Sequence, residues 1–313
     1  MQKGWSNKWL FPVILMLGML PASAQIFDKT KGKNVKLVLR SPVIVHATES
    51  KIYNERLVTA FKNYWKVSPY ELYSPIKDYE VDKNSAYAVF LPAIVGLEVR
   101  DHATTMNYPF YVYGEATSKG KAYGEAIICA FPINAVHYEF DAKAEHIYER
   151  AALRLPYIVY NLNDMVRWLS EKESTKDYID SVQAKATRLV KKTLLIPNDV
   201  VKEWDVNPNA TALFKNNLDA AKRKMTPIMH NILDEADISY GGKYKIMSAE
   251  EIMKLENSAE ADKYALFLPA VDERKYMLAY DLKTKELLYY ETTKASNKIK
   301  SKDFDRMNKV VGF

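Results

Sequence analysis

The densest group of metal-ligating side chains in this sequence lies in HYEFDAKAEH, residues 137–146. His137, Glu139 and Asp141 alternate along it, so an extended strand would place all three on one face. Imidazole and carboxylate groups bind zinc and other divalent ions, which predicts a site for a metal-assisted hydrolase. The segment lacks an H-x-x-x-H or H-E-x-x-H pattern and also fits a solvated edge strand that runs into a helix, so this second interpretation stays open.

A second candidate site is the tyrosine- and glycine-rich segment YGEATSKGKAYGEA, residues 113–126. Its glycine spacing does not fit a phosphate-binding loop and favours a β-hairpin that turns at the Lys-Gly pair. Glycines within strands let a ligand or another backbone approach closely, and exposed tyrosines suit sugars or a peptide strand. Packing of the tyrosines across the sheet is the structural alternative. The candidate binding residues are Tyr111, Tyr113 and Tyr123.

Two possible nucleophiles lack the partners that their chemistry requires. Ser118 and Lys121 have the spacing of a serine β-lactamase pair, but the S-D-N and K-T-G motifs are absent. Cys129, the one cysteine, lies in an apolar stretch that favours packing in a strand over catalysis. We therefore predict no catalytic residues and no cofactor, and we expect a non-catalytic protein rather than an enzyme.

An internal near-repeat indicates the elements that position these residues. The segments YAVFLPAI, residues 87–94, and YALFLPAV, residues 264–271, agree at six of eight positions. Each follows a short alternating stretch that ends in Ser74 or Ser248, and a serine before proline or an acidic turn is typical of a helix N-cap. Because order and spacing agree as well as letters, we expect a tandem duplication. Chance likeness between two buried strands is the alternative.

Each copy is predicted to contain a strand, a helix, a strand, a short helix, a strand and a hairpin, in that order. A strand that leaves through a helix and returns favours a βαβ crossover, so the predicted fold class is α/β. We expect each near-repeat strand to end at its proline. The main predicted strands, helices and hairpins are 35–45, 54–65 and 108–133 in the first copy and 193–197, 210–236 and 275–291 in the second.

A helical connector, residues 143–192, is expected between the copies. Apolar residues at steps of three and four predict a long helix that Pro156 bends, followed by a polar helix over about 175–192. The predicted domains are the first repeat, 25–142, and the second repeat, 193–313.

The first 24 residues have the pattern of a secretory signal peptide. Two lysines precede an apolar run at 10–20, which is too short to span a bilayer, and residues 22–24, Ala-Ser-Ala, fit a signal-peptidase site. We expect the mature chain to begin at Gln25 and to be periplasmic or extracellular. No cysteine follows the cut, so a lipoprotein anchor is not expected.

The formal net charge is +6, and basic residues concentrate at 29–36, KTKGKNVK, and 294–302, KASNKIKSK. Such runs attract anionic polymers or lipid headgroups, although solvated mobile tails are the simpler interpretation. We expect at most peripheral membrane contact through these tails. Because no nucleic-acid-binding motif is recognisable, no nucleic-acid partner is expected.

The signal end PASAQ resembles that of exported Bacteroidota proteins, and residues 61–92, FKNYWKVSPYELYSPIKDYEVDKNSAYAVFLP, resemble a recurrent uncharacterised segment in such proteins. The βαβ order is similar to the small α/β domains that begin periplasmic TolB-like and curli-secretion-like envelope proteins, although the lipoprotein cysteine of some members is missing. The resemblance carries over no catalytic residue. From the export signal, the duplication without a catalytic constellation and the tyrosine- and glycine-rich hairpin, we expect an envelope protein that presents a sheet edge or hairpin to a partner protein or a cell-surface polymer.

Overall fold

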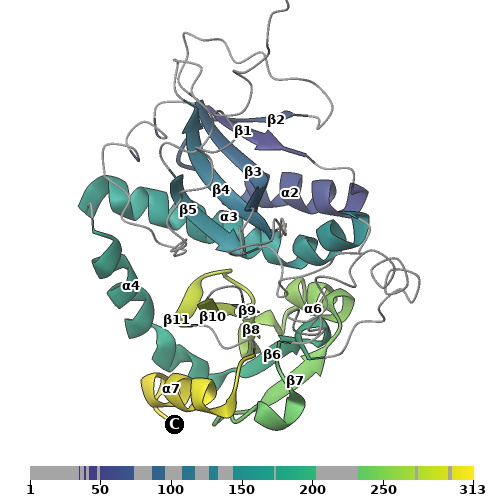
Figure 1. The fold of residues 1–313 in the computed structure, drawn as a ribbon, viewed down its shortest axis with the longest axis vertical. Coiled ribbons are helices and arrows are strands. Elements are labelled where there is room, and N and C mark those ends of the chain that lie inside the picture. The colour runs from purple at the N-terminus through teal and green to yellow at the C-terminus, as the bar shows by residue number, and fades with distance from the viewer. Residues whose placement is uncertain are drawn as a thin grey trace, which may run out of the picture.

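The computed structural model describes residues 35, 39, 42–47, 50–73, 87–95, 108–116, 127–132, 144–172, 174–201, 232–271, 274–294 and 298–313. These residues form two mixed β-sheets with helices packed around them, which confirms the predicted α/β class (Figure 1).

The first sheet has the strand order β2-β1-β3-β4-β5. Strand β1 pairs in parallel with β2 and β3, whereas β4 is antiparallel to both β3 and β5. Helix α2 (Lys51–Tyr64) connects β1 to β2 and confirms the predicted helix; the side chain of Ser50 caps its first turn. The strands are β1 (Val43–His46), β2 (Tyr70–Tyr73), β3 (Tyr87–Val95), β4 (Tyr108–Ala116) and β5 (Ile127–Pro132).

Two expectations about this sheet were wrong. Of the strand predicted at 35–45, the described part is extended only at β1, and the Leu39 N–H donates to the Val35 carbonyl at 3.4 Å, a spacing typical of a helical turn. Strand β3 does not end at its proline, since Pro92 lies within it, opposite Tyr111 of β4. Proline removes a hydrogen-bond donor, and the sheet accommodates it because the pairing of β1 with β3 stops at Phe90.

The second sheet has the order β7-β6-β8-β10-β11, with the short strand β9 beside β10. Strand β6 is parallel to β7 and β8, and β10 is antiparallel to β8 and β11. Helix α6 (Ala249–Glu256) begins with the predicted capping box of Ser248 and Glu251. The strands are β6 (Thr193–Pro197), β7 (Tyr244–Met247), β8 (Tyr264–Phe267), β9 (Ala270–Val271), β10 (Arg274–Asp281) and β11 (Leu287–Lys294).

The main path of the second sheet matches the first strand for strand, in order and in direction. The register of the strands also agrees. In each sheet one strand, β1 or β6, pairs in parallel with a strand on either side, and the residues opposite equivalent positions of β1 and β6 are residues that the near-repeat aligns. This likeness concerns topology, and common origin by duplication stays a prediction. The matched trios are Tyr70, Val43 and Ala88 in the first sheet and Tyr244, Leu194 and Ala265 in the second.

The described part of the connector is helical. Helix α3 (Ala144–Lys172) continues across Pro156. Helix α4 (Thr175–Ala184) is followed by a 3₁₀-helix, η2 (Ala186–Lys191), where a single polar helix was expected. The end of the helix predicted at 210–236 is not α-helical, because Leu233 forms a β-bridge with Ile299 and a 3₁₀ turn, η4, spans Glu235–Asp237. Residues 202–231 lie outside the described part of the chain.

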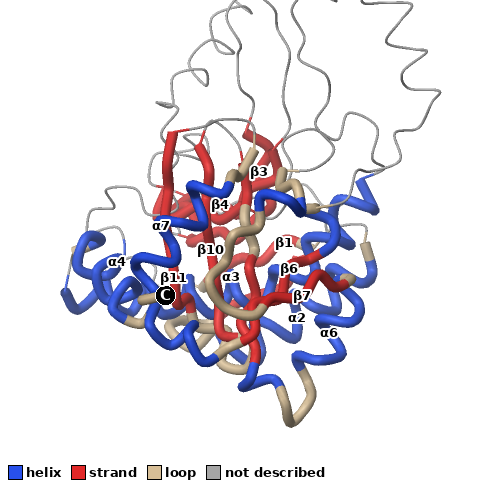
Figure 2. Tube along the Cα trace, turned by 90° about the horizontal axis from the view of Figure 1, so that it is seen from below, coloured by secondary structure: helices blue, strands red, loops and turns tan. Residues whose placement is uncertain are grey.

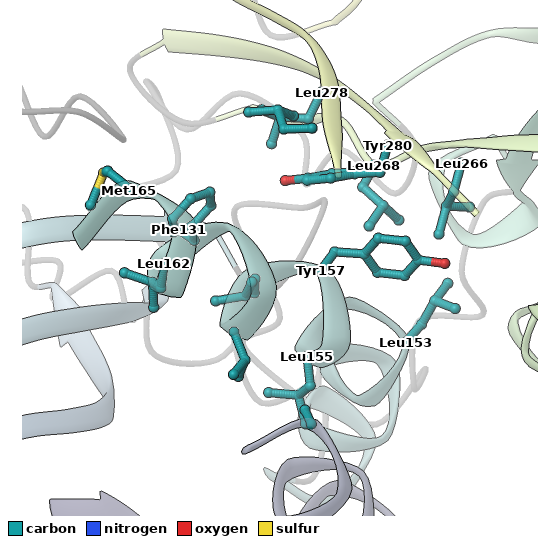
Figure 3. Packing of buried hydrophobic residues seen from close by; sticks show 14 of the residues in the cluster. Phe131, Leu153, Leu155, Tyr157, Leu162, Met165, Leu266, Leu268, Leu278 and Tyr280 are labelled. Atoms are coloured by element: carbon teal, nitrogen blue, oxygen red, sulfur yellow. The ribbon is translucent and has the colours of Figure 1, made fainter. Parts of the chain in front are cut away.

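Helix α3 lies between the two sheets and packs on both (Figures 1 and 3). On one side, Leu162 and Met165 lie near Phe131 of β5. On the other side the Tyr157 ring lies 5.2 Å from that of Tyr280 of β10, measured between centroids. Burying apolar side chains on two sides of one helix joins the two sheets into a single hydrophobic core.

The inner strands β6 and β8 of the second sheet are buried on both faces, so their sequences are continuous apolar runs rather than alternations. Leu195 and Leu266 belong to the core around α3, whereas Leu194 and Ala265 face a second core under η2 and α7 (Ser301–Val311). Figure 2 shows α7 over β10 and β11. Among the described residues, no helix combines the length and the apolarity that crossing a membrane requires.

Candidate functional site

The structure places only two of the residues predicted to bind a ligand. Tyr111 and Tyr113 lie two positions apart on β4, where Tyr111 pairs with Phe131 and Tyr113 pairs with Cys129 of β5. Phe131 is fully buried in the core against α3. Tyr123 lies outside the described residues, and a binding role for the three tyrosines stays a prediction.

The predicted metal ligands His137, Glu139 and Asp141 lie outside the described residues, as do Ser118 and Lys121. Within the ranges that are described, no group of three or more histidine, cysteine, aspartate or glutamate side chains could hold a metal ion. The metal-assisted alternative therefore also stays a prediction.

A buried charge cluster joins the two halves of the molecule at the end of α6. The Glu256 carboxylate accepts from Arg56 Nη2 of α2 at 2.7 Å, and the Lys285 ammonium lies 2.9 Å from its other oxygen. The side chains of Glu256 and Lys285 are 3% and 4% exposed. Burial raises the pKa of the Tyr157 hydroxyl well above its ordinary value, and the nearby Glu256 charge adds to this. Four elements far apart in sequence therefore meet around one carboxylate.

The turn between β10 and β11 is held in this cluster by a side-chain amide of α3. Asn161 Nδ2 donates to the carbonyls of Tyr157, at 2.7 Å, and Lys285, at 2.8 Å. Its Oδ1 accepts from the Leu287 N–H at 2.9 Å. Asn161 is 1% exposed, so these three bonds satisfy polar groups that water does not reach. The hairpin predicted at 275–291 is confirmed, and its turn is a junction between the two halves.

A second ion network, which is more exposed, connects the same turn to η2. Asp281 accepts from the N–H groups of Lys283 and Thr284, at 3.0 and 2.9 Å, which fixes the turn. Arg188 of η2 forms ion pairs with Asp281, at 3.3 Å, and Glu286, at 2.5 Å. These contacts tie the turn to η2, so the charges at this junction hold elements in place.

Lys285 occupies a backbone conformation that favours glycine, with φ of 69°. A residue other than glycine costs about 1 kcal/mol there, and the lysine at this position places its ammonium in the cluster. Burial lowers the pKa of this lysine, and the Glu256 charge opposes that shift.

We expect Lys285→Ala to lower the free energy of unfolding by about 1 kcal/mol more than Lys285→Gly. Both changes remove the ammonium, but only alanine keeps the strained backbone. Urea unfolding of the two variants measures the difference, and equal stability would show that the turn relaxes.

Strands β2 and β7 are the edge strands that pair in parallel with their neighbours, one in each sheet. Their backbone groups can form hydrogen bonds with another strand. Leu194 N–H donates to the Lys243 carbonyl at 2.9 Å, and the equivalent bond in the first sheet joins Val43 N–H to the Pro69 carbonyl at 2.8 Å. Parallel strands pair through every second residue of the edge strand. In β7 the N–H and C=O groups of Tyr244 and Ile246 therefore point away from β6.

The exposure of the two edge strands agrees with this geometry. Tyr244 is 37% exposed on β7, and Leu72 is 45% exposed on β2. The opposite edge of the second sheet is different, because α4 lies along β11 and Gln183 Nε2 donates to the Tyr290 carbonyl. No other described strand pairs with the outer side of β2 or β7. An unpaired edge presents a row of donors and acceptors to another strand, so β2 and β7 are the candidate binding sites.

Sequence reasoning did not find the charge cluster, and although it expected a sheet edge as a binding site, it did not identify β2 or β7 as that edge. Arg56 and Glu256 are 200 positions apart, so no local spacing relates them. The basic segment 294–302 was interpreted as a mobile tail, but its described part belongs to the fold. Lys298 and Lys300 form ion pairs with Asp234 and Asp237, each at 2.9 Å. The side chain of Ile299 between them is fully buried, which explains why the tail interpretation was wrong there.

Neither a family model, nor a curated protein, nor a solved structure matches this chain.

Proposed function

We propose that this chain is a non-catalytic exported protein of the cell envelope that binds an extended segment of a partner polypeptide by adding it as a strand to β7. The observation that supports this most directly is the phase of the hydrogen bonds on that strand. The backbone groups of Tyr244 and Ile246 point away from β6, and they are spaced to pair with every second residue of an incoming strand. Strand addition takes its affinity from such main-chain bonds and its specificity from side-chain contacts beside the edge.

The rigid junction supports the same proposal. Binding is weakened when the binding surface must be ordered at the same time. Here β6 holds β7, and the Glu256 cluster and the Asn161 bonds fix the second sheet on α3. An edge held in this way is ready to bind without a folding step.

We further propose that the two sheets descend from one duplicated unit. The equal strand order, the equal register and the equal phase of the edge bonds support this. On this proposal β2 is a second edge of the same kind, and the segment before Gln25 directs export.

Selection from a displayed library of random dodecapeptides tests the binding proposal, with the mature chain as bait. Selected peptides are expected to lose at least about tenfold in affinity for Tyr244→Pro, which removes an outward N–H. Proline is tolerated at the first residue of an edge strand, so the fold is retained. Tyr244→Ala is the matched control, because it removes the side chain and keeps the N–H.

Two outcomes would contradict the proposal. The first is a set of peptides that bind Tyr244→Pro and the parent chain equally well. The second is stoichiometric metal in the purified protein that is lost, together with hydrolytic activity, in His137→Ala; this would favour the metal-assisted alternative. N-terminal sequencing of the exported protein checks the expected start at Gln25.

A further inference from the structure

Three neighbouring parts of the second half form one continuous surface, which we call the η2–α7 surface: the end of η2 at 190–191, the segment 240–243, and the end of α7 with its last residues, 309–313. The Tyr240 hydroxyl donates to the Leu189 carbonyl of η2 at 3.3 Å. The ring of Phe313 packs edge-on against Tyr240 with centroids 5.1 Å apart. The Gly241 N–H donates to Asn308 Oδ1 of α7 at 2.9 Å. These contacts place the three parts side by side.

Large apolar side chains on this surface are unusually exposed. Val190, Val310 and Phe313 are 46%, 41% and 45% exposed. Gly242 makes room for the Phe313 ring, since a Cβ there would lie 2.7 Å from the Phe313 Cζ. The ring is therefore held in place and stays half in solvent. Exposed apolar side chains on adjoining elements are typical of a surface that contacts something else.

Lysines border these apolar groups. Lys191, Lys243 and Lys309 are exposed, one on each of the three parts. In the described part of the chain, no carboxylate lies within ion-pair distance of any of them. The neighbouring bases Arg188 and Lys192 are different, because both pair with Asp281. The lysines that border the apolar groups therefore have no ion-pair partner among the described residues, so their charges can interact with a ligand.

We propose that the η2–α7 surface docks on an anionic phospholipid bilayer. Lysine ammonium groups would contact the phosphates, while valine and phenylalanine side chains would enter the boundary between headgroups and acyl chains, as in interfacial binding. An anionic bilayer matches both the charge and the apolar side chains, whereas a purely acidic polymer such as polyglutamate matches the charge alone and leaves the three apolar side chains in water. This site is separate from the predicted contact through basic tails, since Lys298 and Lys300 are already paired with aspartates. It is also independent of strand addition at β7.

Co-sedimentation of the mature chain with vesicles tests the proposal. We expect binding to vesicles of phosphatidylglycerol and phosphatidylcholine, and little binding to phosphatidylcholine alone. The triple change Lys191→Gln, Lys243→Gln and Lys309→Gln should lower the partition coefficient by roughly a hundredfold. A matched control removes the same charge elsewhere, from exposed lysines of α2, α4 and the β10–β11 turn, and should bind like the parent; its changes are Lys62→Gln, Lys176→Gln and Lys283→Gln.

A second variant separates lipid from an acidic polymer. Val190→Asn with Val310→Asn keeps every lysine and should also lower binding to the anionic vesicles. The proposal is overturned if the chain does not bind these vesicles, or if the control triple loses binding as much as the test triple. It is also overturned if soluble polyglutamate binds the chain through the same lysines while the asparagine variant keeps its vesicle affinity.

Discussion

Replacing Glu256 with glutamine is expected to lower the free energy of unfolding by about 3–5 kcal/mol, the usual cost of removing one partner from a buried ion pair. Glutamine keeps the shape of the side chain but leaves Arg56 and Lys285 facing a neutral amide. The ammonium of Lys285 then has no counter-charge at the place where its side chain is 4% exposed. Urea or thermal unfolding measures the loss.

Two further variants make this result specific to the buried cluster. Glu250→Gln removes an ion pair of the same helix, but both partners are 74% exposed, so the change should stay within about 0.5 kcal/mol. Glu256→Leu combined with Lys285→Met should recover part of the loss, because apolar replacement of a whole buried pair is often neutral. A Glu256→Gln chain as stable as the Glu250→Gln chain would show that the cluster does not hold the junction.

The second large effect is expected at Asp303 in α7. Its carboxylate accepts from Lys275 Nζ of β10 at 2.7 Å, and the two side chains are 1% and 2% exposed. It also accepts from the Lys300 N–H at 2.8 Å and from Arg306 at 2.5 Å. Asp303→Asn should lower the free energy of unfolding by about 3 kcal/mol, since it leaves Lys275 buried beside a neutral group. Asp305→Asn on the exposed side of the same helix is the control and should change little.

This variant should also alter the response to acid. Burial raises the pKa of Asp303, but the hydrogen bonds from Lys275 and Lys300 outweigh it and hold the pKa below its ordinary value of 3.8. A carboxylate with a lowered folded-state pKa stabilises the fold above the unfolded value, and this stability is lost as pH falls below it. Asp281 and Glu286 are shifted in the same direction. Stability should therefore fall below about pH 4.5, and less steeply in Asp303→Asn; an unchanged slope would contradict this role.

The sequence predicted the elements that local patterns define. Ser248 marked the start of a short helix and formed the expected capping box with Glu251, whereas Ser74 lies outside the described residues. The apolar runs TLLIP and YALF became strands as expected, because strands buried on both faces need no alternation.

The sequence did not predict features that depend on the third dimension. Whether β3 ends at Pro92 depends on where its neighbour β1 stops. Whether Lys300 is a free tail residue depends on Asp237, which is 63 positions away. The same limit applies to the candidate site, because an open edge is a property of strand order. No motif in YKIM, the four residues of β7, indicates that no other described strand pairs on its outer side.

Amide hydrogen exchange along β7, followed by NMR, tests the central claim most directly. That claim is an edge strand whose outward backbone groups are free to bind another strand. We predict alternation in the unbound protein: the N–H groups of Tyr244 and Ile246 exchange quickly, whereas those of Lys245 and Met247, which face β6, are protected. A bound strand should then protect all four. Uniform protection of the four amides in the unbound protein would contradict the account, because it would show that the edge is already paired.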